Sequence, residues 1–162
     1  MEITIRQGIK KDLPSVLKLI KELAEYENSL DQATITLKEL ENDGFGDHPW
    51  YWFLVAEKGS KIIGVSFYWV RYSTWKGKIL FLEDFVITKK YRMKGIGSKL
   101  FEETIKTCQK LDVNGMSWQV LDWNVLAMNF YTKYNADINK NNQWVDGKLT
   151  KEQIDKICSL KK

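Results

Sequence analysis

Residues 79–108 combine a strand pattern, a glycine-containing turn and a helix pattern in direct succession. The strand pattern covers 79–88 and is continuously apolar over Leu80–Leu82, as in a buried strand. The turn reads Arg92-Met-Lys-Gly-Ile-Gly97 and leads into the helix. The first turn of a helix leaves backbone N–H groups unpaired, and glycines let a phosphate group approach them closely. The pattern therefore predicts an anion site at this helix start, with positive charge added by Arg92, Lys94 and Lys99.

This turn alone does not specify a ligand, because helix starts with two glycines are often purely structural. It lacks the glycine spacing of a dinucleotide fold and the Gly-Lys-Ser/Thr of a P-loop. Two flanking features narrow the choice. Glu83 and Asp84 stand beside the apolar strand, where carboxylates cost free energy unless something pairs or uses them. Downstream, Asn124 is a helix cap candidate for a segment that carries Tyr131 on one face.

The rest of the chain alternates between strand and helix patterns. Further strands are expected at 2–7, 51–57, 62–72 and 116–121, with short candidates at 136–138 and 144–145. Further helices are expected after the start signals Asp12 and Pro14, the capping box Thr36–Glu39 and the capping box Thr150–Gln153. The order β-α-α-β-β-β-α-β-α-β predicts an α/β fold, with a mixed sheet and helices on both faces. The length of 162 residues and the absence of linkers predict one domain, 1–162.

Composition excludes several classes of function. Cys108, Cys158 and His48 are scattered, so no zinc site and no other metal site is expected. The net charge of +4 is mild and its lysines are dispersed, which argues against a nucleic-acid partner. The sequence shows neither a signal segment nor a long apolar run. We therefore expect a cytoplasmic protein with free thiols and no membrane partner.

The strand, the Arg-x-x-Gly-x-Gly turn and the Asn…Asn-Phe-Tyr helix together resemble the GNAT superfamily of N-acetyltransferases. Several longer segments are similar to its diamine (spermidine/spermine) acetyltransferase family, and the resemblance runs over nearly the whole chain. These segments are Leu19-Ile-Lys-Glu-Leu-Ala-Glu-Tyr-Glu27, Asp43-Gly-Phe-Gly46, Tyr72-Ser-Thr-Trp-Lys-Gly77, Leu82-Glu-Asp-Phe85 and Tyr91-Arg-Met-Lys-Gly-Ile-Gly-Ser98. The resemblance implies the GNAT fold, with a twisted and mostly antiparallel sheet, and acetyl-CoA as the co-substrate.

Two segments bear on the choice of amine. Ser73-Thr74-Trp75 and Val120-Leu-Asp-Trp-Asn124 are similar to the thialysine acetyltransferase branch. The polyamine branch is expected to carry Asp-Pro where Ser73 and Thr74 stand, and a polycation needs several spaced carboxylates. The family pattern is broken at two places. Asn135 stands where the family has a glycine, and asparagine tolerates the left-handed conformation of such a turn. Asn142-Gln143-Trp144 stands where the family has a Gly-Trp region.

The resemblance implies direct attack of the amine on the thioester, without an acyl-enzyme. An alkylammonium has an ordinary pKa of about 10.4, so it must first lose a proton. Glu83 is the candidate base, through a water; the alternative is that Glu83 only binds the ammonium. Tyr131, a residue type with an ordinary pKa of about 10, is the candidate acid for the departing thiolate. The alternative for Tyr131 is a buried ring packed on the sheet.

The remaining site residues fall into two groups. The predicted cofactor-binding residues, which include the backbone N–H groups expected to meet the oxyanion, are Phe85, Val86, Ile87, Arg92, Met93, Lys94, Gly95, Ile96, Gly97, Ser98, Asn124, Ala127 and Tyr131. The predicted substrate-binding residues are Tyr26, Glu27, Ser73, Thr74, Trp75, Glu83, Asp84 and Asp122. For Asn124, helix capping alone is the alternative role.

The expected activity is acetylation of a primary amine of a small molecule, of the thialysine type or a diamine. Polyamine acetylation is the close alternative. Protein N-acetylation requires an open peptide groove, which the aromatic-rich segments argue against. A non-catalytic coenzyme-A-binding module would lack the acid and the base, yet Glu83 and Tyr131 are both present. The resemblance also implies a homodimer.

Overall fold

The computed structural model describes residues 2–138 and 147–159. The chain divides into two compact units, residues 1–119 and 120–162. The first unit holds the sheet and the turn at Arg92, and the second begins just before the helix that carries Tyr131.

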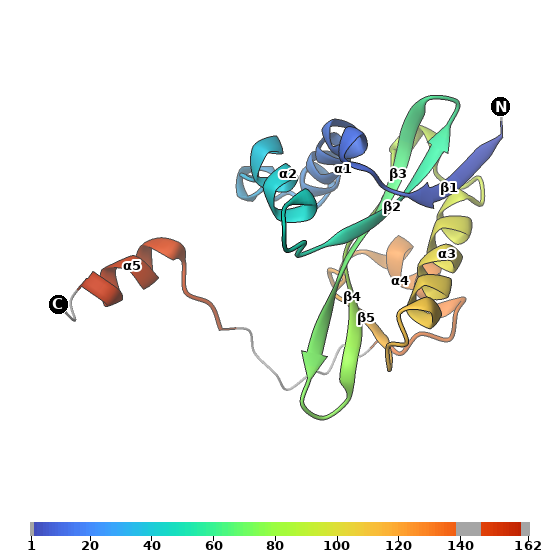
Figure 1. Cartoon of the computed structure of the whole chain (residues 1–162). Coiled ribbons are helices and arrows are strands. Elements are labelled where there is room, and N and C mark those ends of the chain that lie inside the picture. The colour runs from blue at the N-terminus through green and yellow to red at the C-terminus, as the bar shows by residue number, and fades with distance from the viewer. Residues whose placement is uncertain (1, 139–146, 160–162) are drawn as a thin grey trace. The chain divides into compact units, whose positions relative to one another are not determined.

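The first unit is built on a five-stranded sheet with the strands in chain order (Figure 1). Its strands are β1 (Ile3–Gln7), β2 (Trp52–Lys58), β3 (Lys61–Ser73), β4 (Gly77–Ile87) and β5 (Met116–Trp118). Neighbours pair antiparallel except β4 and β5, which are parallel. The predicted mixed, mostly antiparallel sheet is thus confirmed. The strand expected at 116–121 is shorter, because its pairing with β4 stops at Trp118.

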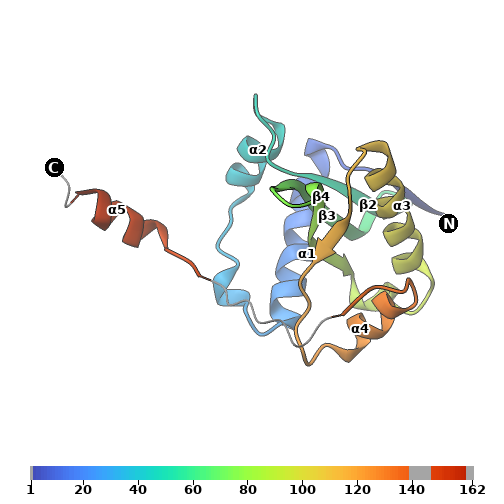
Figure 2. The same ribbon diagram turned by 90° about the horizontal axis from the view of Figure 1, so that it is seen from below.

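Helices cover both faces of this sheet (Figure 2). Helices α1 (Leu13–Tyr26) and α2 (Leu37–Phe45) lie on one face, and α3 (Ile96–Lys110) lies on the other. Both predicted start signals are confirmed: Pro14 is in the first turn of α1, and Thr36 and Glu39 form the capping box of α2. The apolar core between α1, α2 and the sheet is centred on buried side chains including Leu13, Val16, Phe53, Val55 and Val65.

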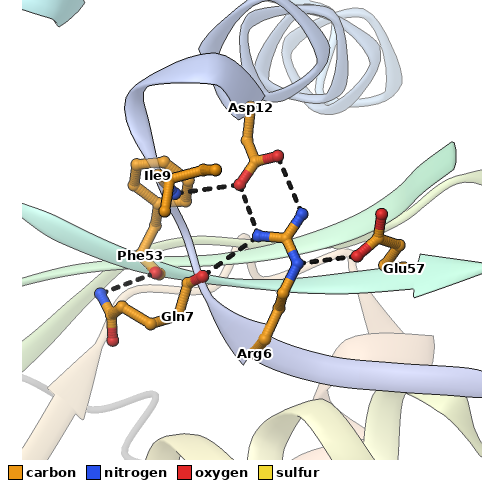
Figure 3. A network of polar contacts seen from close by, with 6 residues as sticks. All are labelled: Arg6, Gln7, Ile9, Asp12, Phe53 and Glu57. Carbon is orange, nitrogen blue, oxygen red and sulfur yellow. Dashed lines mark hydrogen bonds and ion pairs between the residues drawn. The ribbon is translucent and has the colours of Figure 1, made fainter. Parts of the chain in front are cut away.

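A polar network fixes the start of α1 to the sheet (Figure 3). The guanidinium of Arg6 donates two hydrogen bonds to the Asp12 carboxylate, at 2.7 and 3.0 Å, and one to Glu57 at 2.7 Å. These bonds hold the pKa of Asp12 below its ordinary value, although burial opposes them. Asp12 also accepts from the N–H of Ile9, so one carboxylate joins β1, the connecting loop and α1. The helix that reaches the candidate site is therefore anchored at its N-cap residue, Asp12.

The second unit contains α4 (Val125–Thr132) and α5 (Lys151–Ser159). The predicted caps are confirmed, since the Asn124 side chain accepts from the N–H of Ala127, and Thr150 and Gln153 bond to each other. The strand expected at 136–138 is wrong. The chain turns there with Asn135 at φ 55°, and the N–H of Ala136 bonds to the carbonyl of Tyr131 and closes the helix end. The strand candidate at 144–145 and the segment 142–144 lie outside the described residues.

Candidate active site

A β-bulge in β4 sets the direction of the two adjacent carboxylates. Phe67 of β3 pairs with Asp84, and the next residue, Tyr68, pairs with Leu82, so Glu83 is the extra residue without a partner on β3. Bulges re-aim side chains and are frequent beside active sites. Glu83 is exposed and accepts a hydrogen bond from Nε1 of Trp69 at 2.9 Å, whereas Asp84 is half-buried.

Glu27, Glu83 and Asp84 form an acidic cluster, which joins the C-terminal end of α1 to the bulge of β4. Burial raises the pKa of Asp84 to about 6, and repulsion from Glu83 and then Glu27 adds to the shift. Burial also raises the pKa of Glu27. Crowded carboxylates with raised pKa values favour a bound cation, because a positive charge relieves both the desolvation and the repulsion. Asp84 is also suited to accept a proton near neutral pH.

Beyond the bulge, β4 extends past the end of its pairing with β5. The parallel pairing covers Leu80–Leu82, and Phe85, Val86 and Ile87 lie in the part of β4 that follows. The ring of Phe85 packs edge-on against Phe101 of α3, with centroids 5.5 Å apart. The strands therefore part where the sequence predicts backbone N–H groups for an oxyanion.

The turn that follows β4 has the backbone of an anion cradle. After a short 3-10 helix, η3 (Lys89–Tyr91), both Met93 and Gly95 adopt left-handed conformations, with φ of 57° and 75°. Helix α3 starts at Ile96, so Gly97 belongs to its first turn, and its N-cap, Gly95, has no side chain that could accept from the first N–H groups of the helix. A Cβ atom placed on Gly95 meets nothing within 4 Å, so the space above the turn is open. This arrangement fits a pyrophosphate group, which the N–H groups of Ile96, Gly97 and Ser98 can bind.

Arg92 has partners within the protein. Its Nε donates to the carbonyl of Ile87 at 2.7 Å, its Nη2 lies 3.8 Å from the carboxylate of Glu22, and its guanidinium stacks 5.2 Å from the ring centroid of Tyr26. Sequence reasoning placed Arg92 on the cofactor and Tyr26 on the substrate, and it missed Glu22. Both roles stay predictions, and the structure adds that these two side chains contact each other. Lys94 is held near the turn by the carbonyl of Lys90 at 3.3 Å.

The second unit carries four of the predicted site residues. Tyr131 is buried in α4, and its ring contacts that of Phe130 with centroids 5.4 Å apart. Asn124 is buried and caps α4 through the N–H of Ala127 at 3.2 Å, so its capping role is confirmed. Asp122 is exposed. The predicted roles of these residues in binding and catalysis remain predictions.

Ser73, Thr74 and Trp75 lie at the tip of the β3–β4 hairpin. The hydroxyl of Ser73 accepts hydrogen bonds from the N–H groups of Trp75 and Lys76, and Trp75 is 83% exposed. The acidic cluster lies further along the hairpin, because Gly77 at the tip precedes Asp84 by about 20 Å of extended strand. Within one chain, the structure therefore brings Glu27, Glu83 and Asp84 together but does not add the hairpin tip to them.

Residues 2–138 and 147–159 contain neither a membrane-spanning helix nor a metal-binding cluster. No helix in these ranges combines the length and apolarity that crossing a membrane requires. In the same ranges, no three His, Cys, Asp or Glu side chains are grouped so that they could hold a metal ion.

Comparison with known proteins gives consistent matches. The sequence profile of the Acetyltransferase (GNAT) family matches residues 15–136. A thialysine N-epsilon-acetyltransferase of Bos taurus is 37% identical over 151 residues, covering 88% of this chain and 89% of that protein. A human spermidine/spermine N(1)-acetyltransferase-like protein 1 is 35% identical over 158 residues, covering 93% of this chain; the chain spans 23% of that protein's length. An aminoglycoside N-acetyltransferase solved in complex with CoA has a TM-score of 0.69 at 14% identity, covering 91% of this chain and 96% of that one, which shows a shared fold.

Proposed function

Because this chain belongs to the Acetyltransferase (GNAT) family, we propose that it transfers an acetyl group from acetyl-CoA to a primary amine of a small molecule. The observation that carries this proposal is the acidic cluster of Glu27, Glu83 and Asp84, which lies on the same unit as the phosphate turn. Its negative charge suits an alkylammonium substrate. The relatives described above are named a thialysine N-epsilon-acetyltransferase and a spermidine/spermine N(1)-acetyltransferase-like protein, and the substrates in both names carry amines.

The chain's own residues divide the work as follows. Acetyl-CoA supplies the thioester that the amine attacks. The N–H groups at the start of α3 hold the pyrophosphate, and those N–H groups of Phe85–Ile87 that point away from β3 face the developing oxyanion. Glu83 and Asp84 bind the ammonium and take its proton, either directly or through a water. Tyr131 donates a proton to the departing thiolate.

We place a thialysine-type amino acid or a diamine first among substrates. Ser73 and Thr74 put no carboxylate at the hairpin tip, and the thialysine acetyltransferase relative matches this chain over 89% of its own length. Spermidine or spermine is the second candidate, because three carboxylates in one cluster suit a polycation. The proposal includes a single catalytic domain over 1–162, a homodimer and a cytoplasmic location, all expectations that the family resemblance or the composition supports.

The direct test measures thiol release from acetyl-CoA with a panel of thialysine, putrescine, spermidine and a lysine-containing peptide. Release with thialysine or putrescine is expected, with kcat/KM above that for spermidine and for the peptide. Binding of coenzyme A without thiol release from acetyl-CoA for any amine would refute the proposed enzymatic activity. A kcat/KM for spermidine tenfold or more above that for thialysine would instead reverse the order of the two substrate candidates.

Replacing Asp84 by asparagine is expected to stabilise the protein while it weakens the reaction. A carboxyl group whose folded pKa is raised contributes stability that is present below its unfolded pKa and lost as the pH rises through the folded value. For Asp84 this loss of stability occurs between pH 3.8 and about pH 6, and it amounts to at most about 3 kcal/mol. Asp84→Asn should therefore raise Tm by about 5 °C at pH 7.5 and change it little at pH 4.

The same variant is expected to lower kcat/KM for the amine by about 10- to 100-fold, because a cation partner is lost. Thermal unfolding at the two pH values and steady-state kinetics measure the two effects. Asp47→Asn, at an exposed loop position, is the matched control and should change neither. A lower Tm for Asp84→Asn at pH 7.5 would show that Asp84 is not a crowded carboxylate.

A further inference from the structure

One carboxylate on α1 holds both ends of the connection between β4 and the phosphate turn. Glu22 accepts a hydrogen bond from the hydroxyl of Thr88 and another from the N–H of Lys89, the latter at 2.8 Å. The same carboxylate lies 3.8 Å from Nη2 of Arg92. Thr88 and Lys89 open the connection, and Arg92 is the first residue of the turn.

Arg92 closes this connection into a loop. Its Nε donates back to the carbonyl of Ile87, the last residue of β4, at 2.7 Å. Its guanidinium is also stacked on Tyr26, one helical turn after Glu22 on α1. Residues 87–92 are thus held at both ends against α1, with the side chains of Glu22 and Arg92 only 31% and 24% exposed.

The residues fixed in this way lead directly into the anion cradle. Met93 and Gly95 adopt left-handed backbone conformations, and Met93 is a residue type for which this conformation is unfavourable. A carboxylate near a phosphate site lowers the affinity for an anion by repulsion, unless a neighbouring positive charge pairs with the carboxylate. The negative charge of Glu22 is paired with the positive charge of Arg92. The guanidinium of Arg92 also contacts the ring of Tyr26 and is thus turned toward α1.

We infer that Glu22 is a positioning residue for coenzyme A, which sets the conformation of the phosphate turn through Thr88, Lys89 and Arg92. This inference rests on the proposed cofactor site. Five residues after Glu22, the same helix ends next to Glu27 of the acidic cluster. Glu22 in the helix thus supports the cofactor turn, and Glu27, the C-cap of the same helix, belongs to the amine site.

The test compares two charge-equivalent variants of the full chain. Glu22→Gln keeps the side-chain shape but loses the ion pair with Arg92 and replaces one charged carboxylate oxygen, a hydrogen-bond acceptor, by an NH2 group. Glu25→Gln removes the same charge from an exposed position three residues along α1. Calorimetric titration with coenzyme A at fixed ionic strength is expected to show about tenfold weaker binding for Glu22→Gln. Binding by Glu25→Gln is expected to stay within about twofold of the wild type.

Repulsion and positioning predict opposite changes in the affinity of Glu22→Gln for coenzyme A. If Glu22 acts only as a nearby negative charge, Glu22→Gln binds coenzyme A as tightly as the wild type or more tightly, and the inference is overturned. A positioning role also predicts a raised KM for acetyl-CoA with kcat at saturation changed by less than about threefold.

Thr88 gives an independent test that does not depend on how well Glu22→Gln folds. Thr88→Val removes the hydroxyl that donates to Glu22 and should weaken coenzyme A binding, whereas Thr88→Ser keeps the hydroxyl and should restore it. Equal, wild-type binding by both Thr88 variants overturns the inference. Since the readout is cofactor binding, a wild type that binds coenzyme A but acetylates no amine refutes the proposed function and leaves this inference intact.

Discussion

Replacing Gly95 by aspartate is expected to reduce the affinity for coenzyme A by at least about a hundredfold. Gly95 has a φ of 75° and precedes the first residue of α3, and its missing Cβ leaves open space above the turn. A carboxylate in that space competes with the pyrophosphate of coenzyme A for the site and repels its negative charge. Two negative charges about 4 Å apart near a protein surface repel by about 4 kcal/mol.

Gly95→Asn is the matched control for this change. Asparagine and aspartate have nearly the same shape, and both tolerate a left-handed backbone better than other side chains. The asparagine variant measures the effect of bulk and strain, and the further loss in the aspartate variant, at least about tenfold, measures charge. Calorimetric titration with coenzyme A gives both numbers. Equal affinities for the two variants would show that the pyrophosphate does not lie above Gly95.

Local signals explain why most of the fold was predictable. Capping boxes such as Thr36–Glu39, the proline in the first turn of α1 and the apolar run in β4 act over a few residues, and each is found where expected. The segment 136–138 failed because a strand needs a partner strand. Its first N–H instead bonds within the helix end at Tyr131, and a three-residue pattern carries no information on that competition.

The site needed information that only pairing and packing supply. Sequence reasoning identified Glu83 and Asp84 as adjacent carboxylates, but the bulge that separates their environments follows from the register of β3 on β4. The raised pKa of Asp84 follows from burial, which a sequence does not show. Likewise, the charges of Glu22 and Arg92 are visible in the sequence, but their pairing across 70 residues of chain is a property of the fold.

Replacing Tyr131 by phenylalanine is expected to lower kcat by about a hundredfold or more. The thiolate that leaves the thioester needs a proton or a strong hydrogen bond, and a tyrosine hydroxyl is a donor at neutral pH. Phenylalanine removes only this hydroxyl and keeps the buried ring and its contact with Phe130. The affinity for coenzyme A should therefore stay within about threefold of the wild type.

Tyr134→Phe separates catalysis from packing, because Tyr134 lies three residues further on and its ring contacts the same Phe130, at 5.6 Å between centroids. If hydroxyl loss in this region acted through stability, both variants would show a lower Tm and a similar loss of rate. A proton-donor role predicts instead that Tyr134→Phe keeps kcat within about threefold, while Tyr131→Phe loses far more rate than any change in its Tm accounts for. A wild-type kcat for Tyr131→Phe would remove the acid role and assign Tyr131 to packing alone.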